Sequence, residues 1–357
     1  MKKILHIVEA FGGGVFTMLN DLSNGVCNEY EVVIAYSVRK ETPQNFEKLF
    51  DKKIKFIEVK NFTRNINFIK DIKTLKELKK IIKEEKPDII HLHSSKAGVL
   101  GRFIARGKKY KMLYNPHGFS FLKQDDSKFK RICYRTIEKM MTIINPKCII
   151  VGCSQGEYEE AKKLSKNSIC INNGINIKEL EEKAKKLQKH ETDFKNLKIC
   201  TIGRIGYQKN PKLFNEIAES LPNNKFTWIG DGELKNELIS PNIKITGWKD
   251  KEKVLEELNK NDIFILTSLW EGLPIALLEA GYMKKLCIVT DVIGNRDVIK
   301  NNINGHIFNK YNEVYNLIMN IKKENYINFI NKFHKEIIEN YNSENMAQKY
   351  NDIYKEI

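Results

Sequence analysis

Residues 262–284 read DIFILTSLWEGLPIALLEAGYMK, and this stretch carries the clearest fold signal in the 357-residue chain. The apolar run over 262–266 predicts a buried strand, and the residues over 274–284 predict a helix after a short loop. Pro274 suits the first helical position, so we expect the amides of Gly272 and Leu273 to face whatever lies beyond the strand. Strand, loop and helix in this order are typical of a parallel α/β sheet.

The same alternation continues in both directions along the chain and predicts an α/β fold with two doubly wound, Rossmann-like domains in tandem. We expect an N-terminal domain over 1–180, a charge-dense linker over 181–196 and a C-terminal domain over 197–340. Residues 341–357 are expected to form a helix that packs back on the N-terminal domain. Strands are predicted near 3–8, 31–36, 54–59, 88–92, 111–115, 147–151, 168–171, 197–202, 225–230, 243–246, 262–266, 286–290 and 305–308. Helices are predicted near 15–27, 66–85, 96–107, 127–144, 155–164, 211–220, 233–240, 250–260, 274–284 and 311–323, and the tail from 325 is helical in pattern.

Composition indicates a globular protein that binds anions. The formal net charge is +16, and 41% hydrophobic with 30% charged residues excludes a disordered or low-complexity chain. No apolar run approaches the roughly 20 residues of a spanning helix, so any membrane contact should be peripheral. The seven cysteines lack the spacing of a zinc site and are expected to be buried in a reducing cytosol.

In the C-terminal domain, two loops carry residues suited to a nucleotide. Arg204 and Lys209 lie five apart on a glycine-bearing loop, where they could clamp a diphosphate and stabilise its departure without a metal; a solvated loop is the alternative. Glu271 could hold sugar hydroxyls. Glu279, in an apolar helix, is expected to be half-buried without a protein partner and to bind ribose hydroxyls, unless it pairs with a distant lysine.

In the N-terminal domain, candidate residues follow three predicted strands. Gly12–Gly14 form a loop after the first strand where a ligand could approach the backbone closely. The loop matches the fingerprint of a nicotinamide dinucleotide site poorly, and a tight turn without a ligand is the alternative. His91 and His93 share one face of the fourth strand, and Lys96 beside a helix start suits an anion, although the histidines could simply fill a sheet edge. His117 follows the fifth strand and is the better candidate histidine.

The region 102–135 is strongly basic and includes much of the predicted helix over 127–144. That helix carries an apolar stripe with lysines and arginines nearby, which is typical of a surface for anionic lipid. A core-facing helix with a solvated back is the alternative. Nucleic acid is a weaker prediction, because no nucleic-acid-binding motif occurs.

Over essentially its whole length the chain resembles a family 4 retaining glycosyltransferase of the GT-B architecture, in which two such domains face a central cleft. The most specific match is a pair of glutamates separated by seven residues, Glu271 and Glu279. The family order is also met by Gly203-Arg204 with Lys209, by Gly230-Asp231-Gly232 with Glu233, by Asn173-Gly174-Ile175 and by the N-terminal glycine loop. Asn210 stands where many members have glycine, which changes little.

The resemblance implies a role for each matching residue. The implied catalytic residues are His117, Glu271, Arg204 and Lys209. The implied donor-binding residues are Gly13, Gly14, Gly203, Arg204, Lys209, Gly230, Gly272, Leu273, Pro274 and Glu279. The implied acceptor-binding residues are Gly12, His93, Lys96 and Phe119. The runs His93–Gly98 and Pro116–Phe121 are similar to bacterial members that build capsule, O-antigen or other envelope polysaccharides.

The implied reaction transfers a sugar, with retention and without a metal, from a nucleotide-diphosphate sugar such as a UDP-sugar to a hydroxyl of a polyprenyl-diphosphate-linked glycan. The enzyme would be cytoplasmic and would bind the inner face of the plasma membrane peripherally through region 102–135, with no nucleic-acid partner. Two alternatives stay open at this point. One is a GT-B nucleotide-sugar 2-epimerase, and the other is a non-catalytic protein that binds anionic lipid or nucleic acid.

Overall fold

The computed structural model describes residues 1–63, 66–107, 110–188 and 190–357. The chain folds into two compact units, of which unit 1 comprises residues 1–174 and 343–357 and unit 2 comprises residues 175–342. The chain therefore leaves unit 1 at Gly174, before the expected boundary at 180, and returns to it at Ser343.

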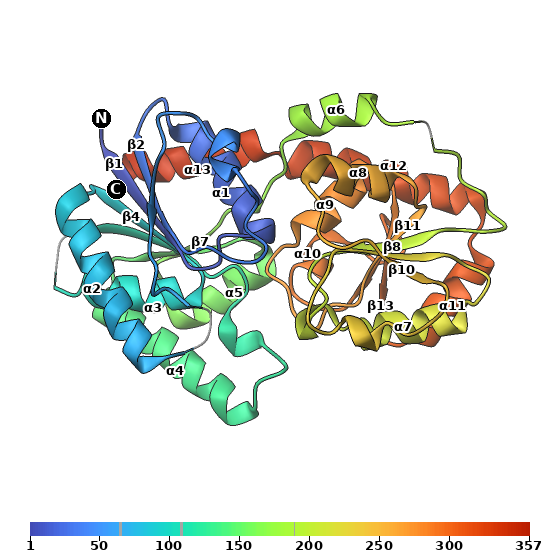
Figure 1. The fold of residues 1–357 in the computed structure, drawn as a ribbon, viewed down its shortest axis with the longest axis horizontal. Coiled ribbons are helices and arrows are strands. Elements are labelled where there is room, and N and C mark those ends of the chain that lie inside the picture. The colour runs from blue at the N-terminus through green and yellow to red at the C-terminus, as the bar shows by residue number, and fades with distance from the viewer. Residues whose placement is uncertain (64–65, 108–109, 189) are drawn as a thin grey trace. The chain divides into compact units, whose positions relative to one another are not determined.

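Unit 1 is built on a seven-stranded parallel sheet with the strand order β3-β2-β1-β4-β5-β6-β7. The strands are β1 (Lys3–Val8), β2 (Glu31–Tyr36), β3 (Lys55–Glu58), β4 (Ile89–His93), β5 (Lys111–Asn115), β6 (Ile149–Gly152) and β7 (Ser168–Cys170). The helices are α1 (Gly13–Val26), α2 (Phe68–Glu85), α3 (Ser95–Ile104), α4 (Lys128–Ile144), α5 (Gln155–Leu164) and α13 (Ser343–Glu356), with short 3₁₀ helices at Phe46–Leu49 and Ser120–Leu122. Helices α1 and α13 cover one face of the sheet and α2, α3 and α5 the other, with α4 packed on α3 and α5 (Figure 1).

Unit 2 repeats this plan on a six-stranded sheet with the order β10-β9-β8-β11-β12-β13. The strands are β8 (Ile199–Ile202), β9 (Phe226–Ile229), β10 (Ile243–Ile245), β11 (Ile263–Leu266), β12 (Leu286–Thr290) and β13 (His306–Phe308). The helices are α6 (Ile177–Lys185), α7 (Pro211–Ser220), α8 (Lys251–Asn259), α9 (Ile275–Tyr282), α10 (Asn295–Val298), α11 (Tyr311–Asn320) and α12 (Lys323–Asn340), with 3₁₀ helices at Tyr207–Lys209 and Lys235–Glu237. Helices α7 and α11 lie on one face of the sheet and α8, α9 and α12 on the other (Figure 1).

Each sheet reverses its winding direction at one place. In unit 1 the chain runs outward from β1 to β3 and then crosses back to β4, so β1 and β4 flank the switch point. In unit 2 the switch point lies between β8 and β11. Ligands of open α/β sheets bind beyond the carboxyl ends of the strands at such a point, which directs attention to the loops that follow these four strands.

The strand predictions are confirmed along the whole chain, and two other expectations are wrong. The helix expected over 233–240 is only the 3₁₀ turn Lys235–Glu237. The charge-dense segment expected to be a linker begins with α6, which belongs to unit 2. The signal for α6 is local: the side chain of Asn176 accepts a hydrogen bond from the Glu179 amide at 3.0 Å, as an N-cap does.

The C-terminal tail forms two helices with different partners. Helix α12 packs on α9 within unit 2, whereas α13 packs on α1 within unit 1. Tyr350 and Tyr354 of α13 are fully buried against the sheet of unit 1. The end of the chain is therefore part of the core that supports the β1 and β4 edge.

Candidate functional site

The loops after β8 and β11 of unit 2 are joined into one structure. The Thr267 hydroxyl donates to the Lys209 carbonyl at 2.6 Å, and the Leu269 amide donates to the Gln208 carbonyl at 2.8 Å. The Gln208 side-chain amide returns a hydrogen bond to the Trp270 carbonyl at 2.9 Å. These bonds hold the residues of the predicted diphosphate clamp beside those of the predicted sugar site.

Two of the predicted catalytic residues form an ion pair at this edge. Lys209 Nζ lies 2.7 Å from Glu271 Oε1, and both side chains are largely buried. The Gln208 amide lies 3.4 Å from the other carboxylate oxygen of Glu271. The structure thus brings Lys209 and Glu271 together as expected, and it adds Gln208, which sequence reasoning missed.

Arg204 is held by a different carboxylate. Its Nε lies 2.9 Å from Glu233 Oε2, and both side chains are more than a third exposed. Because an exposed pair of this kind contributes little to stability, an incoming phosphate can displace the carboxylate at small cost. Arg204 is therefore placed on the same loop as Lys209 with its guanidinium accessible.

Glu279 in α9 is buried, but the expectation that it lacks a protein partner is wrong. The ammonium group of Lys251, at the start of α8, donates a hydrogen bond to its carboxylate. A third of the Lys251 side chain is exposed, whereas Glu279 is 4% exposed. Lys251 lies 28 residues before Glu279, and only the folded chain shows the contact.

The residues at the start of α9 differ slightly from expectation. Pro274 is the N-cap and not the first helical residue, because the helix begins at Ile275. Gly272, Leu273 and Pro274 are all buried in this structure. Gly203 and Gly230 both have a positive φ, at +140° and +145°. A Cβ at Gly230 would lie 2.2 Å from the Gly203 carbonyl oxygen.

The switch point of unit 1 holds a group of four histidines. His6 of β1 is paired in register with His91 of β4, and both are fully buried together with His93. His93 Nδ1 lies 3.1 Å from His117 Nε2, and His93 Nε2 lies 3.0 Å from His6 Nδ1. The prediction that His91 and His93 share a face is confirmed, since their ring centroids are 4.2 Å apart. His6 was not predicted, although it interrupts the apolar run of the first strand.

Helix α13 anchors His91. The ring accepts from the Tyr354 hydroxyl through Nδ1 and donates to Asn115 Oδ1 through Nε2, each at 2.6 Å. Burial lowers the pKa of His91 to about 4, and burial together with the neighbouring histidines lowers the pKa values of His6 and His93 well below the usual range. The group is therefore neutral at physiological pH.

Among the described residues, His6, His91 and His93 are the group whose ring nitrogens lie close enough to hold a metal, within 4.8 Å of one another. Both nitrogens of His91 and of His93 already take part in hydrogen bonds within the protein. A metal would have to break these bonds in a fully buried place. The geometry therefore fits a hydrogen-bonded cluster better than a metal site.

The loop that carries His117 is held in place from α5. His117 and Gly118 both have positive φ, at 53° and 92°. The buried carboxylate of Glu157 accepts hydrogen bonds from the Gly118 amide at 2.6 Å and from the Cys153 amide at 2.8 Å. Glu157, which sequence reasoning missed, thus fixes the turn that leaves His117 partly exposed.

The four predicted acceptor residues differ in how accessible they are. Gly12 is half-buried near Glu41, and the neighbouring Gly13 and Gly14 are exposed at the start of α1. His93 and Phe119 are fully buried, Phe119 being stacked on Phe121, so neither side chain is open to a ligand here. Lys96 pairs with Asp71 of α2 at 2.6 Å and also donates to the Thr63 carbonyl, which corrects the expectation of a lysine awaiting an anion.

Helix α4 buries only Met141 of the apolar stripe that its sequence predicts, which consists of Phe129, Ile132, Cys133, Ile137, Met140 and Met141. Its buried residues are Glu138 and Met141, whereas Phe129, Ile132, Met140 and Ile143 are between 51% and 75% exposed. Helical spacing places these four on the side opposite Glu138. The alternative of a core-facing stripe is therefore wrong.

The basic region 102–135 is less uniform than its composition suggests. Arg102 is fully buried and lies 2.5 Å from Glu138, so it is a core residue. Lys108 and Lys109 lie outside the described residues. Lys128 and Arg135 of α4 stay exposed beside the apolar stripe.

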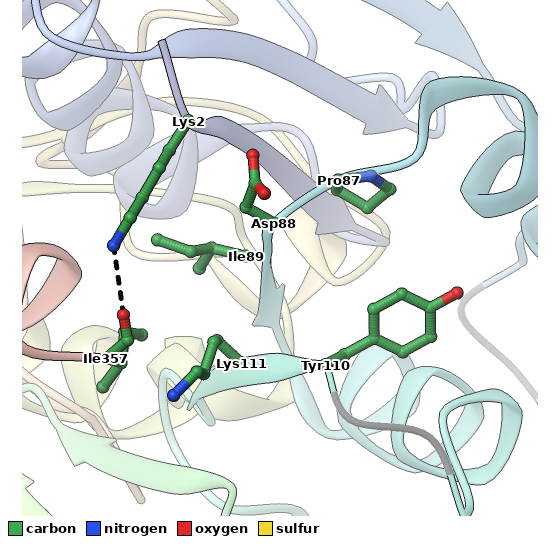
Figure 2. Close-up of a pocket in the computed structure, with 7 residues that line it drawn as sticks. All are labelled: Lys2, Pro87, Asp88, Ile89, Tyr110, Lys111 and Ile357. Carbon is green, nitrogen blue, oxygen red and sulfur yellow. Dashed lines mark hydrogen bonds between the residues drawn. The ribbon is translucent and has the colours of Figure 1, made fainter.

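A pocket of unit 1, drawn in Figure 2, lies at the strand ends opposite the loops that follow β1, β4 and β5. It is lined by Lys2, Pro87, Asp88, Ile89, Tyr110, Lys111 and Ile357, and Lys2 Nζ donates to the Ile357 carbonyl at 3.2 Å. These residues stand where β1, β4 and β5 begin. Because ligands of such sheets bind at the carboxyl ends, we do not assign the pocket to the site.

Comparison with known sequences covers both units. Residues 3–150 match the family described as glycosyl transferase 4-like, and residues 182–344 match glycosyl transferases group 1. The chain is 31% identical over 338 residues to the UDP-Gal:alpha-D-GlcNAc-diphosphoundecaprenol alpha-1,3-galactosyltransferase of Escherichia coli, covering 85% of this chain and 84% of the relative. The chain belongs to the family 4 glycosyltransferases. A further relative, 26% identical over 325 residues, is the GalNAc-alpha-(1->4)-GalNAc-alpha-(1->3)-diNAcBac-PP-undecaprenol alpha-1,4-N-acetyl-D-galactosaminyltransferase of Campylobacter jejuni, with 85% and 84% of the two chains covered.

Solved structures agree on the fold of this glycosyltransferase. Sucrose-phosphate synthase from Thermosynechococcus elongatus matches 99% of both chains with a TM-score of 0.81 and 13% identity. Anabaena HepE in complex with UDP and glucose matches the full length of both chains with a TM-score of 0.78 and 12% identity. The GT-B fold class is thereby confirmed. Within the described residues, no helix is both long enough and apolar enough to cross a membrane.

Proposed function

We propose that this glycosyltransferase moves a sugar, with retention and without a metal, from a UDP-sugar to a hydroxyl of a polyprenyl-diphosphate-linked envelope glycan. The observation that carries the proposal is the Lys209–Glu271 ion pair at the switch point of unit 2, with Arg204 on the same loop. The relatives in Escherichia coli and Campylobacter jejuni have names that specify undecaprenol-linked acceptors, and the former name specifies a UDP-sugar donor. These names support the choice of donor and acceptor class.

In this proposal the cations of unit 2 stabilise the leaving group. The bond between the anomeric carbon and the β-phosphate oxygen breaks, and negative charge develops on that oxygen. Arg204 exchanges its exposed carboxylate partner for the diphosphate. Lys209, whose ammonium has three N–H donors, binds the diphosphate while it keeps its bond to Glu271, so positive charge is in place as the bond to the anomeric carbon breaks. Two such cations can do the work that a metal does in other transferases.

Glu271 is assigned to hold the transferred sugar and not to attack it. Its two carboxylate oxygens are bonded to Lys209 and Gln208, which makes the carboxylate a weak nucleophile. The acceptor hydroxyl would then attack the anomeric carbon from the side on which the diphosphate leaves. Its proton passes to the departing phosphate oxygen, and the configuration is retained.

Unit 1 is proposed to bind the acceptor at the carboxyl edge of its sheet. The exposed Gly13 and Gly14 offer a backbone surface beside β1, and His117 offers a partly exposed imidazole beyond β5. His117 is proposed to face the transferred sugar. Neutral groups suit this task, because a sugar hydroxyl needs directed hydrogen bonds and not a charge.

Helix α4 is proposed to hold the enzyme against an anionic membrane surface. Phe129, Ile132, Met140 and Ile143 would enter the interface between lipid headgroups and acyl chains, while Lys128 and Arg135 meet the headgroup phosphates. An acceptor linked to polyprenyl diphosphate is confined to such a surface. Docking by α4 would therefore bring unit 1 close to its acceptor.

The experiment that tests the reaction uses the full chain, first without acceptor. Thermal stabilisation is measured with a panel of nucleoside diphosphates and their sugars, with and without a chelator. Transfer is then measured to a synthetic undecaprenyl-diphosphate sugar, and the anomeric configuration of the product is read by NMR. We expect UDP and its sugars to stabilise the protein equally with and without the chelator. We also expect the anomeric configuration of the product to be the same as that of the donor. Inversion, loss of activity with chelator, or conversion of the donor to its C2 epimer without transfer would contradict the proposal.

The membrane contact has its own test. Binding to vesicles containing phosphatidylglycerol is compared for wild type, for Phe129→Ser with Ile143→Ser, and for a control with Ile239→Ser and Met319→Ser, exposed apolar residues of unit 2. We expect the α4 variant to lose roughly tenfold in vesicle affinity and the control to bind as wild type. Equal binding by all three proteins would exclude α4 as the docking helix.

A further inference from the structure

A row of hydrogen-bonded imidazoles crosses the switch point of unit 1 and ends at His117. The bonds run from His117 Nε2 to His93 Nδ1 over 3.1 Å and from His93 Nε2 to His6 Nδ1 over 3.0 Å. The ring planes of His93 and His117 are 13° apart, so their bond lies close to both planes. His6 and His93 are fully buried, and only His117, at the end of the row, is partly exposed.

The number of protons in this row is fixed. Burial lowers the pKa of each of the three imidazoles below its usual value, so all are neutral at pH 7. A neutral imidazole has one N–H and one bare nitrogen. Two consecutive bonds then allow two arrangements: every N–H points toward His117, or every N–H points toward His6. In the first, the outer nitrogen of His117, Nδ1, carries a proton, and in the second it is bare.

The far end of the row distinguishes the two arrangements. His6 Nε2 is buried and has no hydrogen-bond partner among the described residues. If every N–H pointed toward His6, this nitrogen would carry a buried N–H with no acceptor. In the other arrangement it carries only a lone pair. Buried N–H groups without an acceptor are rarer than buried acceptors without a donor, which favours protons pointing toward His117.

The neighbouring His91 does not offer His6 another partner. Its Nε2 donates to Asn115 Oδ1, an oxygen that can only accept. The orientation of Asn115 is set by its own amide group, which donates to the Tyr350 hydroxyl at 2.7 Å. His91 Nδ1 is occupied by the Tyr354 hydroxyl. Both nitrogens of His91 are therefore engaged outside the row.

We propose that His6 and His93 are positioning residues that hold His117 in the tautomer with its proton on Nδ1. The row then presents a neutral N–H donor, of fixed direction, to an oxygen of the bound ligand. Glu157 complements it by fixing the backbone of Gly118, so the ring and its loop are held independently. The inference rests on the proposed function in one respect, namely that the oxygen belongs to a hydroxyl of the transferred sugar.

Nitrogen NMR of the full chain tests the tautomer directly. The chain has seven histidines, so a spectrum of the ¹⁵N-labelled imidazoles contains few signals, and His117→Asn identifies those of His117. We expect the bound proton of His117 on Nδ1 at pH 7.5. A proton on Nε2, or a charged imidazole, would overturn the inference even if no variant of the row were to fold.

Two substitutions at His6 test whether the row acts on the reaction. His6→Asn keeps an N–H close to the position of Nδ1, whereas His6→Leu fills similar space without a donor. We expect kcat to fall about tenfold in His6→Leu and to stay within about threefold in His6→Asn, with little change in KM for the acceptor. The His117 signals should change tautomer only in His6→Leu. Equal kcat values in both variants at equal thermal stability would show that the N–H of His6 does not act on the reaction.

A third variant separates this inference from the proposed function. If His117→Ala keeps full transfer activity, the role of His117 at the sugar is wrong, whatever its tautomer. If His117→Ala is inactive and the NMR places the proton on Nε2, only the inference about the row is wrong. In the residual activity of His117→Ala, a rise in donor KM beside the fall in kcat assigns the oxygen to the donor sugar, as we expect, and a rise in acceptor KM instead contradicts that assignment.

Discussion

The two units place different chemical groups at the corresponding point of their sheets. Both place polar residues at the switch point of a parallel sheet. Unit 1 has a row of uncharged imidazoles there beside one ion pair, Arg39–Glu9, whereas unit 2 has ion pairs. In unit 2 the pairs Lys209–Glu271, Lys251–Glu279 and Arg204–Glu233 join residues of different loops and helices. The histidine row itself carries no charge at pH 7 and offers only the direction of its hydrogen bonds.

This difference fits the ligands that we propose for each unit. A diphosphate carries charge that must be balanced, and cations that the ion pairs already hold at the switch point can balance it. A sugar hydroxyl is neutral, and a fixed N–H or lone pair recognises it by direction. The comparison predicts that the two units respond differently to pH, to charge removal and to changes of backbone conformation.

The largest expected difference is in acid stability. His6, His91, His93 and His117 have pKa values below the usual 6.5 because they are buried, with His91 at about 4 and His117 at about 3. The unfolded chain takes up these protons first, so the stability of unit 1 is full above pH 6.5 and falls as the pH drops toward 4. Each group contributes a slope of about 1.4 kcal/mol per pH unit, or roughly 6 kcal/mol per pH unit for the four.

Urea unfolding between pH 7 and pH 5 measures this difference. All three tryptophans, Trp228, Trp248 and Trp270, lie in unit 2 and report its unfolding by fluorescence, while hydrogen exchange in β1 and β4 reports unit 1. Burial also lowers the pKa of His306, to about 4, and the pKa of His334, both in unit 2. Two groups act there against four in unit 1, so unit 2 should lose at most about half as much stability. Equal losses of stability in both units would show that the buried histidines of unit 1 do not make it more sensitive to acid than unit 2.

Removal of one cation from unit 2 should have the next largest effect. Lys209→Met deletes a charge that we assign to the leaving diphosphate, so kcat/KM should fall by about 10²–10³. Steady-state transfer kinetics measure the loss, and Lys212→Met, an exposed lysine of the adjacent α7, is the matched control. A Lys209→Met enzyme with more than about a tenth of wild-type kcat/KM would show that its charge does not stabilise the leaving group.

Substitutions in the pair Lys251–Glu279 of unit 2 are expected to have a smaller effect on the reaction. Glu279→Gln removes the carboxylate that we assign to the ribose, and donor KM should rise about tenfold with kcat nearly unchanged. Lys251→Met frees that carboxylate, and because Lys251 is partly exposed its loss should change donor KM less than about twofold. Donor KM for the two variants decides between two roles: an equal rise in both would make Lys251 itself a donor-binding residue.

The sequence predicts the elements of both units better than it predicts their polar contacts. Parallel strands buried on both faces are continuous apolar runs, and runs such as 263–266 and 286–290 are visible without any knowledge of the fold. The expected helix over 233–240 fails for a tertiary reason, since Gly232 lies against the backbone of Ile205, where a Cβ would come within 2.1 Å of its carbonyl oxygen. Local pattern contains no information on such a contact.

In the candidate site, too, the sequence predicts the residues better than it predicts their contacts. Arg204, Lys209, Glu271 and Glu279 could be selected from spacing and residue type, because strand, loop and helix place them at one edge. Their partners could not, since Lys251 and Glu279 meet only when α8 and α9 lie on the same sheet face. His6 was missed for a related reason. Its role depends on contacts with the histidines of β4, and the pairing of β4 with β1 is a long-range contact.

The smallest predicted effect concerns backbone conformation at Asn210, the position where many family members have glycine. Its φ is +49°, a conformation that glycine and asparagine adopt at little cost, and its side chain caps α7 by accepting from the Leu213 amide at 3.3 Å. Asn210→Gly keeps the conformation and loses a weak cap, so the free energy of unfolding of unit 2 should fall by only a few tenths of a kcal/mol. Asn210→Ala loses the cap and strains the backbone, with an expected cost of about 1–3 kcal/mol. Urea unfolding followed by tryptophan fluorescence measures both, and kcat should change in neither unless Lys209, the preceding residue, shifts. An equal loss for glycine and alanine would mean that the side chain of Asn210, which both variants lack, and not its backbone conformation, sets the stability at this position.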